Sequence, residues 1–233
     1  MDEQIEVEEF VVLVRRHARA RRMTLRVSRA DGRVLLTLPL RASLRAGQQF
    51  AASKAGWLRQ TVAQMPQPSV VADGARLPVA GVEVTLRLLP VKAVTLQGNM
   101  LAVPQSRPAG PTVQAWLRHQ AHLALRDSVD RHAANLGLSP SALALRDTRS
   151  RWGSCTAQGR LMFSWRLAMA PPPVLDYVAA HEVAHLAHMD HSPRFWAQVE
   201  ALMPGHAPHR AWLRRHGAEL MAWRFRDAPD AQP

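Results

Sequence analysis

Two histidines and a glutamate stand at a spacing that can activate water. His181 and His185 are four residues apart, and Glu182 follows the first of them directly. On a helix, residues four apart share a face with Cβ atoms about 5–6 Å from each other, so both imidazoles can reach one tetrahedral Zn²⁺. Glu182 would then project beside the metal, where its carboxylate can take a proton from water. This is the HExxH pattern, which predicts a zinc centre with Glu182 as the general base.

The third protein ligand is open between two histidines. His191 follows His181 by ten residues, the spacing of the motif HExxHxxGxxH, in which glycine lets the chain leave the helix and return to the metal. Here His188 takes the glycine position, and histidine is among the residues that tolerate left-handed conformations. If the helix continued, His188 itself would lie on the ligand face. Pro193 disfavours that continuation because proline restricts the residue before it, so the spacing favours His191.

The elements that must position this motif can be placed from the surrounding pattern. Three prolines, Pro171 to Pro173, suit the first turn of a helix that carries the motif. Upstream, a long helix over 112–136 should end at Gly137 as its C-cap. Three short strands are expected after it, and the last two form a hairpin. Their residue ranges are 143–146, 152–155 and 161–165.

The N-terminal half has the pattern of a strand-rich unit. Alternating apolar residues before and after Asp31-Gly32 predict a hairpin over 23–38. A helix should follow from Ser43, as N-cap, to about Met65. Further short strands are predicted at 82–88, 94–96 and 100–103. The proline- and glycine-rich stretch 106–111 is the best internal boundary.

Composition excludes several classes of protein. The 233 residues include a single cysteine, Cys155, so an intrachain disulfide and a structural zinc site built on cysteines are both excluded. The first residues are acidic and lack the pattern of a signal peptide. No window approaches the 18 apolar residues of a membrane span. We therefore expect a cytoplasmic protein with no membrane contact.

Positive charge is concentrated in the N-terminal half. Residues 10–126 contain 18 Lys and Arg against three acids, a net charge of +15. The densest cluster comprises Arg15, Arg16, Arg19, Arg21, Arg22, Arg26 and Arg29. Such a stripe could bind the phosphates of a nucleic acid. However, 28 of the 30 basic residues are Arg, so a compositional bias and a solvated sheet face also explain it.

The chemistry-bearing segments resemble the YgjP-like metallopeptidase family, which is related to the SprT-like and WLM zinc peptidases. The resemblance is carried by Arg151–Cys155, Phe163–Leu167, Asp176–Val178, His181–His185, Met189–Ser192 and Phe195-Trp196. It implies that His181, His185 and His191 bind zinc and that Glu182 is the catalytic base. The predicted helices and strands indicate an α+β fold. We expect a small N-terminal strand-rich α+β unit over 10–105 and a zincin-like metallopeptidase unit over 111–223, with an active-site helix and a small sheet.

The expected function is that of a zinc-dependent hydrolase, a metallopeptidase acting on peptides or proteins. One alternative keeps the metal chemistry and hydrolyses a non-peptide amide or ester. Another is a nucleic-acid-binding module with a structural metal, although such a metal would not need Glu182. Asp176 or Asp190 could orient a ligand imidazole. The residue that stabilises the oxyanion stays open among Arg151, Tyr177, His206 and His209.

Overall fold

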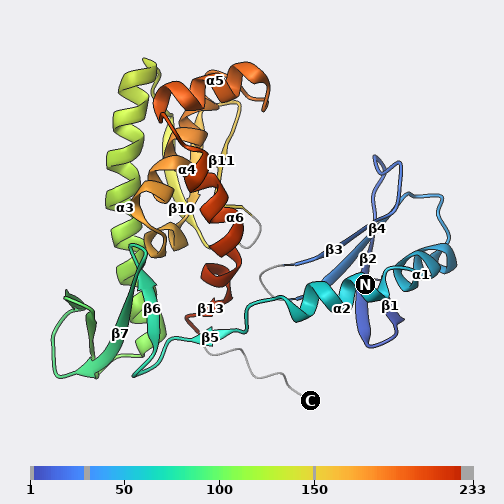
Figure 1. Cartoon of the computed structure of the whole chain (residues 1–233), viewed down its shortest axis with the longest axis horizontal. Coiled ribbons are helices and arrows are strands. Elements are labelled where there is room, and N and C mark those ends of the chain that lie inside the picture. Colours follow the sequence, from blue (N-terminus) through green and yellow to red (C-terminus); the bar gives the residue numbers. More distant parts are fainter. Residues whose placement is uncertain (1–2, 29–31, 149–150, 227–233) are drawn as a thin grey trace. The chain divides into compact units, whose positions relative to one another are not determined.

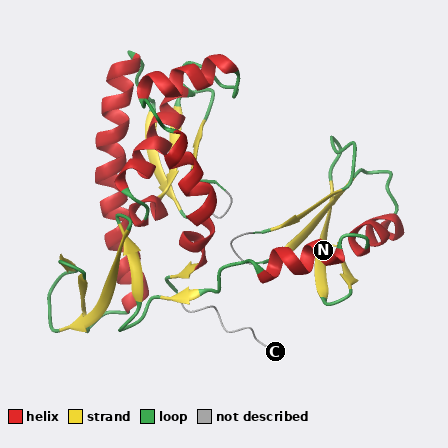
Figure 2. Ribbon diagram, viewed as in Figure 1, coloured by secondary structure: helices red, strands yellow, loops and turns green. Residues whose placement is uncertain are grey.

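The chain divides into two units, Met1–Gln67 and Pro68–Pro233, in a computed structural model that describes residues 3–28, 32–148 and 151–226 (Figure 1). Both units combine helices with small β-sheets (Figure 2), which confirms the predicted α+β class. The sequence placed the boundary at 106–111, whereas the structure places it at 67/68. The reason lies in the core, because the strands of residues 76–104 pack with the long helix that follows them. The stretch 106–111 therefore consists of a turn and the first residues of that helix.

The first unit is a four-stranded sheet with two helices. Its order is β1-β2-β4-β3, in which β2 and β4 are parallel and the other pairs antiparallel. Val12, Leu36 and Leu58 have no exposed surface and share one core. Because alternate side chains of a strand face opposite sides, every second residue of the sheet points into that core. The elements are β1 (Glu3–Val7), β2 (Phe10–Arg16), β3 (Thr24–Val27), β4 (Val34–Leu38), α1 (Leu44–Ala52) and α2 (Ala55–Ala63).

The sequence predicted part of this unit correctly. The hairpin over 23–38 is confirmed by the antiparallel pairing of β3 with β4, although Asp31 in its turn lies outside the described residues. Strand β1 was missed, and it precedes the predicted unit boundary at residue 10. The sequence feature that indicated this strand was the alternation of the apolar residues Ile5 and Val7 with polar residues, but the many acidic residues around them obscured it.

The helix predicted over 43–65 is two helices. Ser43 caps the first as expected, its hydroxyl accepting a hydrogen bond from the Ala46 amide at 3.1 Å. The helical conformation is then interrupted at Ser53 and Lys54 before α2 begins. The apolar periodicity continues across this break, so the pattern alone could not reveal it.

The second unit contains two larger sheets and one small pair of strands. The first sheet has the order β6-β7-β9-β8 and the second the order β10-β12-β11. Antiparallel pairing of β11 with β12, with Gly153 opposite Phe163, confirms the predicted hairpin. Two-residue strands β5 and β13 pair in parallel and join the two ends of the unit. The strands are β5 (Ser69–Val70), β6 (Arg76–Val79), β7 (Val82–Leu89), β8 (Thr95–Gln97), β9 (Met100–Pro104), β10 (Ala142–Arg146), β11 (Gly153–Cys155), β12 (Arg160–Ser164) and β13 (Trp223–Arg224).

Helix α4 is the central helix of the second unit. It contacts α3, α5, α6 and β11, and Ala179, Ala180 and Val183 on it have no exposed surface. A helix that is apolar on all sides belongs to a core, so its buried polar side chains need a specific reason. Helix α3 ends at Gly137, whose φ of 73° confirms the predicted C-cap. The helices are α3 (Ala109–Leu136), η1 (Trp165–Met169), α4 (Pro172–Ala184), α5 (Pro193–Leu202) and α6 (Ala207–Ala222). Among the described residues, no helix is long and apolar enough to cross a membrane.

Candidate metal centre

Three histidine rings meet at the C-terminal end of α4. His181 lies in its last turn, His185 is its C-cap, and His191 comes from the loop before α5. One ring nitrogen from each lies within 4.8 Å of the others, and the Nε2 atoms of His181 and His191 are 3.2 Å apart. The chain leaves the helix after Ala184, which allows His191 to return to the other two rings. The result is a cluster of three potential nitrogen ligands.

His188 lies outside this cluster because the helix does not continue to it. Its backbone carbonyl oxygen instead lies 2.9 Å from Nδ1 of His185. With its proton on Nδ1, His185 donates to that carbonyl and presents the Nε2 lone pair to the cluster. A hydrogen bond of this kind fixes both the tautomer and the orientation of a ligating imidazole. His188 thus acts on the cluster through its main chain.

Two aromatic side chains of α5 hold the rings in place. Phe195 is fully buried, and its ring centroid lies 4.9 Å from that of His181, 4.4 Å from His185 and 4.8 Å from His191. Trp196 packs on His181 and His191 at 5.7 Å and 5.9 Å. The sequence suggested only core packing for Phe195 and Trp196. Their proximity to the histidines follows from the N-cap Ser192, which starts α5 immediately after His191.

Glu182 is buried against the edge strand β11. The residue is only 5% exposed, and its Oε2 atom has no hydrogen-bond partner in the described part of the chain. Burial raises the pKa of Glu182 to about 8, opposed by the positive charge of Arg151. Burial and the negative charge of Glu182 raise the pKa of the half-buried Cys155 thiol on the same strand, so it is not activated as a nucleophile. Burial of a carboxyl group without a partner costs stability, and such a group is a candidate for a functional role.

The donor set fits a metal ion that prefers nitrogen. Burial lowers the pKa of His181 to about 3, with further lowering by the nearby His185 and His191, and burial also lowers the pKa of His185. Neutral imidazoles keep the lone pair that a metal requires. Three imidazoles, without a thiolate, suit the borderline ion Zn²⁺ in a site that leaves a fourth position open.

A stack of rings continues from the cluster toward α6. Tyr177 lies 6.0 Å from His181 between ring centroids, and His206 stacks on Tyr177 at 5.7 Å. His206 also stacks on Trp196 at 5.8 Å, while Glu200 lies 2.8 Å from its Nδ1 atom. Of the four candidates for oxyanion stabilisation, Tyr177 and His206 therefore lie beside the cluster. The positive charge of Arg151 acts on Glu182. His209 contacts His206 through a backbone hydrogen bond, its amide donating to the His206 carbonyl at 3.1 Å.

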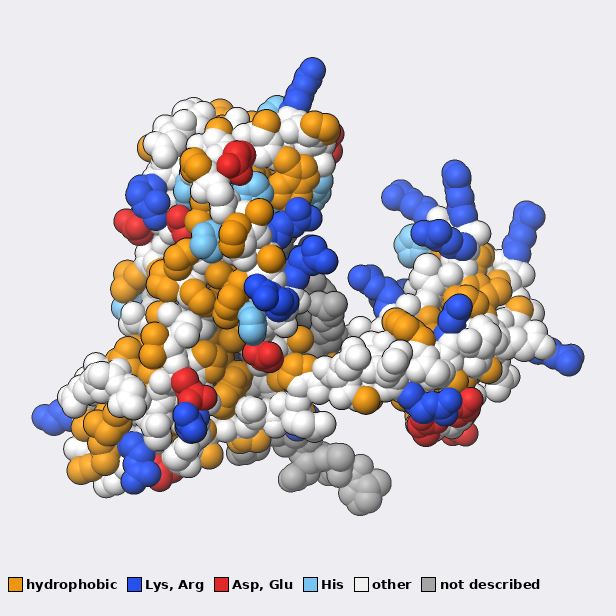
Figure 3. Space-filling view, viewed as in Figure 1, with side chains coloured by type: hydrophobic (Ala, Val, Ile, Leu, Met, Phe, Trp, Pro, Cys, Tyr) orange, Lys and Arg blue, Asp and Glu red, His pale blue; other side chains and the backbone are white. Residues whose placement is uncertain are grey.

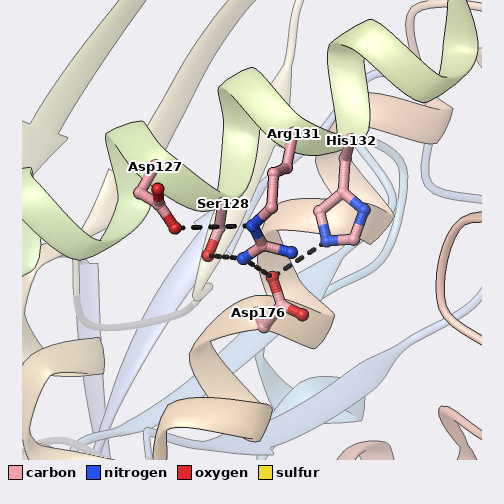
Figure 4. Close-up of polar contacts among 5 residues, drawn as sticks. All are labelled: Asp127, Ser128, Arg131, His132 and Asp176. Atoms are coloured by element: carbon pink, nitrogen blue, oxygen red, sulfur yellow. Dashed lines mark hydrogen bonds and ion pairs between the residues drawn. The ribbon is translucent and has the colours of Figure 1, made fainter.

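Asp176 does not orient a ligand imidazole, contrary to one expectation. It instead joins α4 to α3, as Figure 4 shows. Its Oδ1 atom lies 2.9 Å from Nε2 of the buried His132 and 3.1 Å from an Nη atom of Arg131. Although burial raises the pKa of Asp176, hydrogen bonds to His132 and Ser128 and the nearby charges lower it to about 2. This contact fixes the helix that carries the histidines.

The depressed pKa of Asp176 predicts acid sensitivity. A carboxyl group with a lowered folded-state pKa adds stability above its unfolded value, and that stability is lost as the pH falls. The relevant window runs from about 4, the ordinary value for Asp, to about 2. We expect Asp176→Asn to be less stable than the native protein at pH 7 and to lose less stability across this window. Urea unfolding at several pH values tests this, and equal slopes for both proteins would contradict it.

Comparison with known proteins gives one extensive match. A family model described as "YgjP-like, metallopeptidase domain" matches residues 21–216. A solved structure described as the metallopeptidase zymogen of Pyrococcus abyssi abylysin is 21% identical, with 40% of this chain and 92% of that chain covered and a TM-score of 0.36. Curated proteins gave no match.

Proposed function

This chain belongs to the YgjP-like metallopeptidase family, and from that premise we propose that it cleaves peptide bonds with zinc held by His181, His185 and His191 and with Glu182 as the general base. Family membership makes it a metal-dependent peptidase. The identity of the metal and the roles of the residues are our proposal. One observation carries it. Glu182, whose buried Oε2 atom has no partner among the described residues, directly follows His181, and the ring nitrogens of His181, His185 and His191 lie within 4.8 Å of one another.

The chain's own residues would divide the work around the metal. A bound zinc ion would supply Lewis acidity toward the scissile carbonyl and make water more acidic. Glu182 would accept the proton of the attacking water at a carboxylate oxygen and then give it to the leaving amine nitrogen. Oε2 of Glu182 is buried and has no hydrogen-bond partner among the described residues, so no protein donor would compete with water for that atom. Phe195 would keep the three rings oriented by packing against each of them.

The sequence is also compatible with two other functions. A non-peptide amide or ester would be hydrolysed by the same groups, but the family match favours peptide bonds. A purely structural metal would leave the burial of Glu182 without a purpose.

The test is metal analysis combined with cleavage of a peptide library, in which native protein, chelator-treated protein and Glu182→Gln are compared. Cleavage that survives removal of the metal would reject the proposal. The cytoplasmic location stays a prediction.

A nucleic-acid partner also stays a prediction, and it rests on the first unit. Arg16 pairs with Glu3 at 3.4 Å and Arg59 with Glu8 at 2.6 Å, so the acids of this unit are engaged by few of its arginines. In the described part of the chain, Arg15, Arg21, Arg22 and Arg26 form no ion pair, whereas Arg29 lies outside the described residues. Figure 3 shows basic side chains spread over the visible face of this unit and its acids gathered in one place.

If this surface binds phosphates, the logarithm of the DNA association constant should decrease linearly with the logarithm of the salt concentration. The slope should be about 0.7–0.9 for each phosphate contacted. Reversal of Arg15, Arg22 and Arg26 to Glu should flatten the slope and leave cleavage of a short peptide unchanged. Fluorescence anisotropy with a labelled oligonucleotide measures both effects. Arg59→Ala is the matched control, because this guanidinium is already paired with Glu8. A slope equal to that of the native protein would reduce the arginines to a solvated face.

A further inference from the structure

Position 153 requires glycine because there is no room for a Cβ atom, and not because of its backbone conformation. Among the described residues, seven glycines have a positive φ, and Gly153 is not one of them. Any L-residue could therefore adopt its backbone conformation. A Cβ atom at this position, however, would lie 2.6 Å from Cγ and 2.7 Å from Cδ of Glu182. Strand β11 approaches α4 so closely that the Glu182 side chain occupies the place of the missing methyl group.

Neither the backbone of β11 nor that of α4 can shift easily to relieve this contact. Gly153 pairs with Phe163 of β12, whose side chain is fully buried. On the other side, α4 packs against α3, and its residues Ala179 and Val183 have no exposed surface. Packed interiors resist shifts of even one methylene group. An added methyl at 153 must therefore displace the side chain of Glu182 from its position.

We propose that Gly153 is a positioning residue that holds the carboxylate of Glu182 in the orientation needed for proton transfer. This inference rests on the proposed role of Glu182 as the base. The flat backbone of β11 forms one wall of the space around the carboxylate, which is 5% exposed. The histidine rings are held separately by Phe195 of α5. Gly153→Ala should thus separate the position of the base from the retention of the metal.

Gly110 offers a matched control for a steric clash elsewhere in the same unit. Gly110 lies at the start of α3, and a Cβ atom there would lie 2.8 Å from the carbonyl carbon of Phe225. Gly110→Ala therefore introduces an overlap at least as severe, but with the backbone of Phe225 and not with Glu182. Both variants should lower Tm. Only Gly153→Ala should alter catalysis per folded molecule.

The first measurement is kinetic and uses a fluorogenic peptide selected from a library with the native protein. Gly153→Ala should bind one zinc per chain, as the native protein does, with kcat lowered about 10²-fold, the scale of a 1 Å misplacement, and KM within about 2-fold, because substrate contacts are retained. Gly110→Ala should keep the native kcat. A native kcat for Gly153→Ala would overturn the inference.

The second measurement is a thermodynamic cycle that does not depend on activity. If Glu182 is what the new methyl meets, Gly153→Ala should lower Tm in the native background and leave it unchanged in the Glu182→Ala background, since contacting residues couple. Gly110→Ala should lower Tm equally in both. An equal loss of Tm for Gly153→Ala in both backgrounds would overturn the inference.

The cycle also covers a variant that does not fold. If Gly153→Ala yields no folded protein, recovery of folded protein by Gly153→Ala with Glu182→Ala supports the contact, and failure to recover it counts against it. The proposed function is judged separately by Glu182→Gln. Full activity of that variant would reject Glu182 as the base, whatever the cycle shows for Gly153.

Discussion

Glu182→Gln is expected to lose at least about 10²-fold in kcat for peptide hydrolysis, the usual scale of general acid–base catalysis, while it retains one zinc per chain. Glutamine has the same size and fills the same space against Gly153. It cannot accept a proton from water as a carboxylate does. Because the native carboxylate is buried without a partner in the described structure, its removal leaves no broken ion pair, so Tm should not fall.

The control for this variant is Glu219→Gln on α6. Glu219 lies on the surface at 3.4 Å from Nδ1 of His216, away from the histidine cluster, and its replacement should leave kcat unchanged. Steady-state kinetics and elemental analysis on the same samples give both quantities. A Glu182→Gln variant as active as the native enzyme would reject the mechanism. Loss of zinc together with activity would show that Glu182 supports metal binding and would not test its role in proton transfer.

Zinc content is expected to depend on three histidines and not on the fourth. His181→Ala or His185→Ala should abolish the stoichiometric metal, because two imidazoles from one helix end anchor the site. His191→Ala should weaken zinc binding by more than the roughly 10–100-fold typical of an outer-shell partner. His188→Ala should have little effect, since His188 contacts His185 through its main-chain oxygen, which alanine retains.

Competition with a chromophoric chelator measures these affinities. The comparison of His191 with His188 is decisive, as both lie in the same loop after α4 and carry the same side chain. Greater zinc loss from His188→Ala than from His191→Ala would contradict the proposed ligand set. Circular dichroism of the metal-free proteins separates loss of a ligand from loss of the fold.

The sequence predicted the local elements of the site better than the contacts between them. The spacing of His181 and His185 is a property of one helix, so it could be read directly. The strand containing Gly153 and the helix containing Glu182 are separated by residues 156–171, which include β12 and η1. Nothing in the spacing indicates that the two elements touch.

Contacts between distant elements caused the remaining differences. The position of Phe195 against all three rings depends on where α5 begins after His191, which the pattern left open. The division of the chain at residue 67/68 depends on a core shared by segments on both sides of 106–111. A stretch rich in proline and glycine has the same composition in a tight turn and in a linker. Composition therefore could not distinguish the two.

The pairing of β5 with β13 sets the order in which the protein can assemble during synthesis. Ser69–Val70 has its partner only at Trp223–Arg224, so the second unit cannot complete this contact until residue 224 has left the ribosome. The first unit is built from residues up to Gln67 alone and can fold while the rest is still being translated. The second unit can therefore complete this pairing only after translation has passed residue 224.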